Sequence, residues 1–221
     1  MKIIVASNNK HKIEEIKAML DGLKLNGQKL EGQKLEVRSL KEEGIEIDPE
    51  ETGKTFEENA YIKAKAVYDY MKAKEKQDPA KADSRNYRNN LVLADDSGLA
   101  VDHLEGAPGV FSARWAGTPC NDQANNEKLL KEMAGVPMEK RQAKFVCAMV
   151  LIGHKIDIRV HGEAPGYLIE AEKGFHGFGY DPIFFSSDLA KTFAEASALE
   201  KNHVSHRAKA LKELKKELAK L

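Results

Sequence analysis

The chain has 221 residues, 42% of them apolar and 32% charged, a composition typical of ordinary globular proteins. Lysine plus arginine number 35 and aspartate plus glutamate also number 35, so the formal charge is zero. Proteins that coat nucleic acid by neutralising its phosphates are usually net basic, so the charge balance argues against that class.

Signals for membrane insertion, export and disulfide bonding are missing from the sequence. No run reaches the roughly 18 apolar residues that a membrane-spanning helix needs. The apolar run after Lys2 is also too short for the core of a signal peptide. Two cysteines, Cys120 and Cys147, are too few for a disulfide framework or a four-thiolate zinc site. We therefore expect a cytoplasmic protein with reduced thiols.

The spacing of apolar residues predicts strands alternating with helices. Residues 3–6 are typical of a buried strand, and Ile13, Ile16 and Leu20 then recur at helical spacing. Thr55 and Glu58 form a capping box, which predicts that a helix begins there. The remaining predicted elements are the apolar helical stripe Phe56, Ala60, Ala64, Val67 and Met71, a strand at 91–94 that ends at Asp95 and Asp96, a helix around 125–133, strands at 145–152, 156–160 and 167–169, and a helical stripe from 204 to 221.

Strands interleaved with helices predict an α/β fold with a mixed sheet. Two polar segments, 21–36 and 72–90, are predicted to be surface insertions. The first contains the near-duplicate GQKLEGQKLE and the second is charged and contains a proline. No clean linker divides the chain, so we expect one domain, 1–221, built from two lobes.

The polar turn SNNKHK joins the first predicted strand to the first predicted helix. Ser7 supplies a hydroxyl, Asn8 and Asn9 tolerate left-handed backbone, and Lys10 and Lys12 add positive charge. Backbone N–H groups at the start of a helix favour phosphate, so this turn is a candidate phosphate site. It lacks the glycines of a Walker loop, and the alternative is an ordinary helix cap with surface lysines.

Acidic residues occur at two candidate metal positions. Asp95 and Asp96 follow a buried strand, where carboxylates are costly to desolvate unless a partner such as magnesium compensates them. Glu50 or Glu51 could add a second carboxylate, with Asn59 one turn into the next helix, and spacing does not choose between the glutamates. The alternatives are an Asp-Ser-Gly turn and acidic residues that favour the start of a helix.

Two further motifs combine aromatic and basic side chains. In GFHGFGYDPIFF, Phe178 is a candidate stacking platform and Asp181 could accept hydrogen bonds from a base edge. In EKNHVSHR, Lys201, His206 and Arg207 could hold phosphates or donate to carbonyl oxygens. The alternatives are a glycine-rich turn with core aromatics and a basic helix face.

These motifs occur in the order SNNKHK, ETGKTFEENA, LADDSGLAVDHLEGAPGVFSARWAG, GFGYDPIFF and EKNHVSHRAKAL. In this order they closely resemble the inosine/xanthosine triphosphate pyrophosphatase family, also called the Ham1 family, over nearly the whole chain. The resemblance implies an elongated mixed central sheet flanked by helices, with the active site in the cleft between two lobes. It also implies magnesium-dependent hydrolysis of ITP, dITP and XTP to the monophosphate and pyrophosphate, which cleanses the nucleotide pool, by a homodimer that binds neither nucleic acid nor membrane.

Residue by residue, the resemblance implies that Asp96 activates the attacking water and that Glu50 and Asp96 hold the metal. The residues that it assigns to the substrate are Ser7, Asn8, Asn9, Lys10, His11 and Lys12 at the phosphates, Ser97, then Phe178, Gly179, Tyr180 and Asp181 at the base, and Lys201, His206 and Arg207, which complete the pocket. Ser7-Asn8 replaces the commoner Thr-Gly or Thr-His of the family, and the hydroxyl is retained.

Two other functions stay open on the sequence alone. The nearest enzymatic alternative is a Maf-like pyrophosphatase that acts on ordinary or methylated pyrimidine and guanine nucleotides, and the FGYDP and SHR blocks argue against it. The other is a nucleotide-sensing or single-strand RNA-binding protein that uses the same loops without chemistry. The carboxylates of DDSG argue against this second function, because carboxylates repel phosphate unless a metal intervenes.

Overall fold

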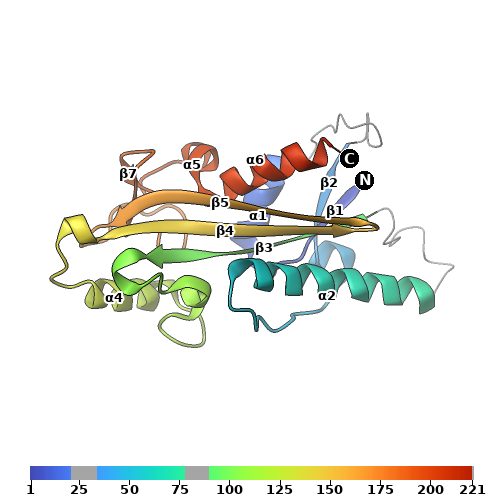
Figure 1. Ribbon diagram of the computed structural model, residues 1–221, viewed down its shortest axis with the longest axis horizontal. Helices are drawn as coiled ribbons and strands as arrows, with labels where there is room; N and C mark the ends of the chain where they lie inside the picture. The colour runs from blue at the N-terminus through green and yellow to red at the C-terminus, as the bar shows by residue number, and fades with distance from the viewer. Residues whose placement is uncertain (21–33, 78–89, 221) are drawn as a thin grey trace. The chain divides into compact units, whose positions relative to one another are not determined.

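The structure is a computed structural model that describes residues 1–20, 34–77 and 90–220 (Figure 1). Its α-helices are α1 (Lys10–Leu20), α2 (Phe56–Gln77), α4 (Asp122–Glu132), α5 (Ala198–Val204) and α6 (His206–Leu218). Its strands are β1 (Lys2–Val5), β2 (Glu36–Ser39), β3 (Asn90–Val101), β4 (Gln142–Gly153), β5 (Ile156–Leu168), β6 (Phe184–Ser186) and β7 (Lys191–Thr192). Short 3-10 helices are η1 (Lys41–Glu43), η3 (Asp102–Leu104), η4 (Gly109–Arg114) and η5 (Met138–Lys140).

The strands form one mixed sheet in the order β2-β1-β3-β4-β5-β6-β7. Strand β1 pairs in parallel with β2 and with β3, whereas β6 pairs antiparallel with β5 and with β7. The helices flank this sheet, so the predicted α/β class with a mixed sheet is confirmed.

The chain divides into two compact units. The first comprises residues 1–96, 148–161 and 210–221, and the second comprises residues 97–147 and 162–209. Strands β3, β4 and β5 each contribute residues to both units. The predicted position of an active site between two lobes stays a prediction.

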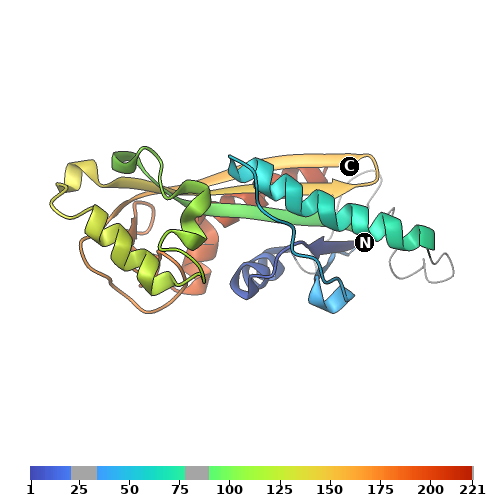
Figure 2. The same cartoon turned by 90° about the horizontal axis from the view of Figure 1, so that it is seen from below.

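The predicted apolar stripe of α2 forms the core of the first unit. Ala60, Ala64 and Val67 are fully buried and pack with Ile4 of β1 and Val92 of β3. In two views, α2 and the part of α6 that belongs to this unit lie on opposite faces of the strands (Figures 1 and 2). Small alanine side chains let a helix backbone approach a sheet closely, so the start of α2 lies directly over β3.

Aromatic side chains fill the core of the second unit. The rings of Phe184 and Phe193 lie 5.0 Å apart, and both contact Phe145 of β4. Beside this cluster, Arg141 is 2% exposed, and its guanidinium donates only to backbone carbonyl oxygens, including that of Leu168 at 2.7 Å. These bonds offset part of the cost of burying the guanidinium charge.

Strand β3 differs from its prediction. The sequence suggested a strand that ends at Asp95 and Asp96, but β3 continues through both aspartates to Val101. The strand can carry the two charges because lysines from the neighbouring helices contact them, as described below. These lysines are remote in the sequence, so the Asp-Ser-Gly pattern alone favoured a turn.

Other boundaries also shift. The separate strands predicted at 156–160 and 167–169 are one strand, β5, and the short strands β2, β6 and β7 were not predicted. Helix α2 continues to Gln77, so residues 72–77 extend a helix, and Glu36 begins β2. The rest of the two predicted insertions, 21–33 and 78–89, lies outside the described residues.

Two further features concern the cysteines and the lengths of the helices. Cys120 is exposed and Cys147 is buried, and both are free thiols. Within residues 1–20, 34–77 and 90–220, the structure contains no helix of the length and apolarity needed to span a membrane.

The capping box of α2 generates a first prediction. The Glu58 amide donates to Thr55 Oγ1 at 3.1 Å, and the Thr55 amide donates to Glu58 Oε2 at 3.1 Å. Thr55→Ala removes one of these bonds and should lower the free energy of unfolding by about 1 kcal/mol in urea denaturation. Glu58→Gln retains an acceptor oxygen and should cost clearly less. Equal unfolding midpoints for the Thr55→Ala variant and the parent chain would contradict the assignment.

Candidate functional site

Two buried aspartates of β3 are each contacted by polar side chains from the helices of the first unit. Asp95 is fully buried and Asp96 is 6% exposed. Consecutive residues of a strand point to opposite faces, so each carboxylate needs its own partner. Lys12 of α1 supplies one, with its Nζ 3.3 Å from Asp95 Oδ2.

Helix α2 supplies the partners of Asp96. Asn59 Nδ2 donates to Asp96 Oδ2 at 3.1 Å, and Lys63 Nζ lies 3.4 Å from Asp96 Oδ1. Lys63 Nζ also contacts Glu51 Oε1 at 2.8 Å, so this lysine joins two carboxylates. Asn59 and Lys63 are four residues apart and lie on the same face of the helix. We call Glu51, Asn59, Lys63 and Asp96 the carboxylate cluster.

Burial and charge shift the pKa values in this cluster. Burial raises the pKa of Asp96 above its ordinary value, although Lys63 and Lys12 favour the carboxylate. Burial alone would lower the pKa of Lys63, but the charges of Asp96, Asp95 and Glu51 together raise it. Lys63 is therefore a cation at neutral pH.

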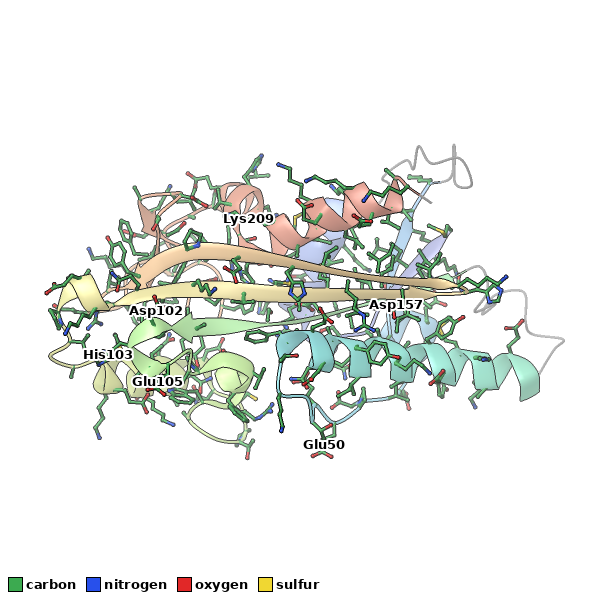
Figure 3. All side chains as sticks on the ribbon, in the orientation of Figure 1. Glu50, Asp102, His103, Glu105, Asp157 and Lys209 are labelled. Carbon is green, nitrogen blue, oxygen red and sulfur yellow. The ribbon has the colours of Figure 1, made fainter. Side chains whose placement is uncertain are left out.

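The structure separates the two glutamates that spacing could not separate. Glu50 is exposed on the loop ahead of α2, and its side chain points away from the helix (Figure 3). Glu51 is half-buried and is joined to Asp96 through Lys63. The structure thus joins Glu51 to Asp96 through Lys63, whereas the metal-ligand role of Glu50 stays a prediction.

The predicted phosphate turn caps helix α1. The Asn9 amide donates to Ser7 Oγ, and Asn9 Oδ1 accepts from the Lys12 amide, both at 3.1 Å. Asn8 Nδ2 donates to Asp48 Oδ1 at 3.0 Å. The capping interpretation of Ser7 and Asn9 is thus confirmed, and it orients the start of α1. Lys10 and His11 are exposed at this end of the helix.

Asp181 organises the glycine-rich loop of the second unit. It is 2% exposed, and its Oδ2 accepts from the Phe178 amide at 3.0 Å and from Lys201 Nζ at 2.6 Å. Lys201 Nζ also lies 4.7 Å from the ring centre of Phe178 and 5.6 Å from that of Phe193. The structure thus gathers Phe178, Asp181 and Lys201, which lie on two separate predicted motifs.

Three more of the predicted residues in the second unit are buried, namely Tyr180, His206 and Arg207. The His206 ring stacks on Phe145 with centres 4.8 Å apart, and Arg207 Nη2 donates to Ser97 Oγ at 2.9 Å. Tyr180 turns away from solvent and its hydroxyl donates to the Ser112 carbonyl at 2.7 Å. Burial raises the pKa of Tyr180, so this phenol is neutral. Tyr180 supports the loop through its core contact.

The oxygen donors of the carboxylate cluster fit a magnesium ion. Magnesium takes hard oxygen ligands and commonly uses one or two protein carboxylates together with phosphate oxygens. Glu51 and Asp96 provide such a pair. Within the described residues, no group of three or more His, Cys, Asp or Glu side chains could hold a metal.

Sequence reasoning missed two residues of these networks. Lys63 looked like one of several lysines in a charged helix, although its spacing of four from Asn59 was a usable signal. Phe193, which contacts Lys201, lies in a segment without recognisable periodicity, and no sequence signal identified it.

Comparison with known proteins connects these networks to a family. A profile described as the Ham1 family matches residues 3–217. The dITP/XTP pyrophosphatase of Clostridium perfringens (strain 13) is 46% identical, with 98% of this chain and 97% of the relative covered. That of Bacillus subtilis (strain 168) is 45% identical over 96% of this chain and 94% of the relative.

Solved structures agree with the sequence relatives. The Staphylococcus aureus Ham1 protein has a TM-score of 0.77 and 35% identity, covering 99% of this chain and 98% of its own. A HAM1 protein from Coxiella burnetii also has a TM-score of 0.77, with 33% identity over 99% of this chain and 98% of its own.

The glycine-rich loop generates a second prediction. Gly177 has a φ of +79°, and a Cβ there would overlap Asp181 Oδ2, whereas Gly179 has a φ of +61° and open space around its missing Cβ. Gly179→Ala should therefore cost only backbone strain, about 1–2 kcal/mol. Gly177→Ala should cost roughly 1–3 kcal/mol more, because Asp181 must move. Chemical denaturation of the two variants checks this difference, and equal costs would show that Asp181 does not fill the space at Gly177.

Proposed function

Because the chain belongs to the Ham1 family, we propose that it hydrolyses non-standard purine nucleoside triphosphates, dITP and XTP with ITP, to the monophosphate and pyrophosphate. Relatives that match almost its full length are named dITP/XTP pyrophosphatase, which supports this substrate class. The structural observation that carries the proposal is the carboxylate cluster, where a buried aspartate is held between an amide and a lysine. Cleansing of the nucleotide pool is the corresponding role.

We propose that the start of α1 binds the phosphates. The positive end of the helix dipole favours anions, and Lys10 and Lys12 add charge there. The caps formed by Ser7 and Asn9 hold the turn in one conformation before substrate arrives. Lys12 also contacts Asp95, which keeps its ammonium group close to β3.

Magnesium is the cofactor that we propose, held by Glu51 and Asp96. When bound, the ion would neutralise negative charge that develops on the phosphate oxygens. Lys63 lies between the same two carboxylates and limits their mutual repulsion before substrate binds. Glu51 takes the role that the family resemblance had placed on Glu50.

Asp96 is the proposed base for the attacking water. Asn59 fixes Oδ2 at 3.1 Å, whereas Oδ1 has the longer contact of 3.4 Å with Lys63. Oδ1 would accept the proton as water attacks the α-phosphorus and pyrophosphate leaves. Before the transfer, Lys63 would favour the ionised form of Asp96, which is the form that can accept the proton.

We propose that side chains of the second unit select the base. The ring of Phe178 would stack on the purine. Asp181 accepts a hydrogen bond from the Phe178 amide, and Lys201 Nζ, which Asp181 also binds, lies 4.7 Å from the ring centre. His206 and Arg207 would donate hydrogen bonds to the 6-keto oxygen. Adenine has a 6-amino group there, so the donors would be left unpaired, which can discriminate by roughly 10⁴.

Pyrophosphate release tests the function directly. With magnesium, the purified chain should release pyrophosphate from dITP, XTP and ITP far faster than from dATP, ATP or GTP. Chelation of magnesium should abolish the release, because two protein carboxylates alone repel a triphosphate. Release of orthophosphate, or equal rates on ATP, would reject the proposed reaction or substrate class.

Asp96→Asn tests the proposed base. The variant keeps a side chain of the same size but cannot accept the proton, so turnover should fall about 10²–10⁴-fold while dITP binding measured by calorimetry persists. Asp157→Asn is the matched control, because Asp157 is an exposed carboxylate on β5 that pairs with Arg159 (Figure 3). Near-parental turnover of the Asp96→Asn variant would remove the assigned role.

A further inference from the structure

Two side chains of α4 hold the backbone of Gly179 from both sides. The Gly179 amide donates to Asp122 Oδ2 at 2.7 Å, and the Gly179 carbonyl accepts from Asn126 Nδ2 at 3.2 Å. Asp122 and Asn126 are four residues apart, so both lie on one face of α4. No family motif noted in the sequence includes either residue.

Asn126 is buried where it makes this contact. Its side chain is 3% exposed, and Nδ2 also donates to Glu172 Oε1 at 3.2 Å. The two hydrogens of the amide nitrogen are therefore used on Gly179 and on Glu172, which precedes the glycine-rich loop. Burial of the amide makes a lost bond costly, so the segment is tied firmly to α4.

The peptide that Asp122 holds is the one that follows Phe178. On its other side, the Phe178 amide donates to Asp181 Oδ2 at 3.0 Å. The amides before and after the Phe178 Cα are thus both bound by carboxylates, which fixes the two backbone dihedrals of that residue. Those dihedrals restrict the rotamers that the aromatic ring can adopt.

We propose that Asp122 and Asn126 are positioning residues that set base selectivity by fixing the Phe178 ring. The inference rests on the proposed function, because it takes Phe178 as the stacking surface for a 6-keto purine. Asp122 acts from the first turn of α4 through a charge-assisted hydrogen bond and touches no reacting atom. Loss of this bond frees the ring, so binding of the base weakens while chemistry at the α-phosphorus continues.

Steady-state kinetics on dITP and dATP test the proposal. Asp122→Ala should raise KM for dITP about tenfold and lower the dITP-to-dATP ratio of kcat/KM about tenfold, with kcat nearly unchanged. Asp122→Asn removes the same charge but keeps an acceptor oxygen, so it should restore most of the ratio. Gln123→Ala is the neutral control, because Gln123 is exposed on the same helix and bonds to Glu127.

A double-variant cycle separates positioning from general stability. In the Phe178→Ala background there is no ring to orient, so Asp122→Ala should no longer change the dITP-to-dATP ratio. Melting temperatures of all variants show whether each is folded. If Asp122→Ala lowers the ratio equally in both backgrounds, or lowers only the melting temperature, the positioning role is wrong.

Failure of the two proposals gives different results. Parental enzyme that releases no pyrophosphate from dITP or XTP overturns the proposed function and this inference with it. Parental enzyme that is active and selective, with an unchanged ratio in the Asp122→Ala variant, overturns this inference alone.

Discussion

Two neighbouring aspartates lie on the buried strand β3, and the first unit depends on the compensation of their charges. Removing a carboxylate from water costs several kcal/mol unless it gains partners, and here Asp95 and Asp96 face opposite ways. Lys12 from α1 meets one, and Lys63 with Asn59 from α2 meets the other. The same contacts place a capped helix end, a second carboxylate and an amide around β3. Charge compensation thus assembles a set of groups suited to a metal and a triphosphate.

In the glycine-rich loop of the second unit, carboxylates are compensated by backbone amides as well as by a lysine. Carboxylates of Asp181 and Asp122 accept from successive amides, and Gly177 leaves the space that the Asp181 side chain occupies. A carboxylate that binds a backbone amide has given up part of its capacity for a ligand. Asp181 holds the Phe178 amide and Lys201 Nζ through Oδ2, and its direct contact with a base edge stays a prediction.

These arrangements divide the work of the proposed reaction. Phosphate attraction depends on local features, a helix start and two lysines, and water activation depends on one aspartate held from two sides. Base selection depends on an aromatic ring whose orientation is controlled by hydrogen bonds to the backbone on either side of it. A change in the support of the ring can therefore alter selectivity without altering the reacting groups, because the two sets share no side chain.

Local patterns in the sequence determined the α/β class, the stripe of α2 with its capping box, and the motifs that carry most candidate residues. These features depend on residues within about one helical turn or one strand, so spacing reveals them. Tertiary structure decided which glutamate is joined to Asp96 through Lys63, that β3 continues through its aspartates, and that Phe193, Asp122 and Asn126 lie around the glycine-rich loop and Lys201. Most of these depend on partners far apart in the chain, such as Lys63 and Asp96 at a separation of 33 residues. Only folding brings such charges close enough to offset the cost of burying them.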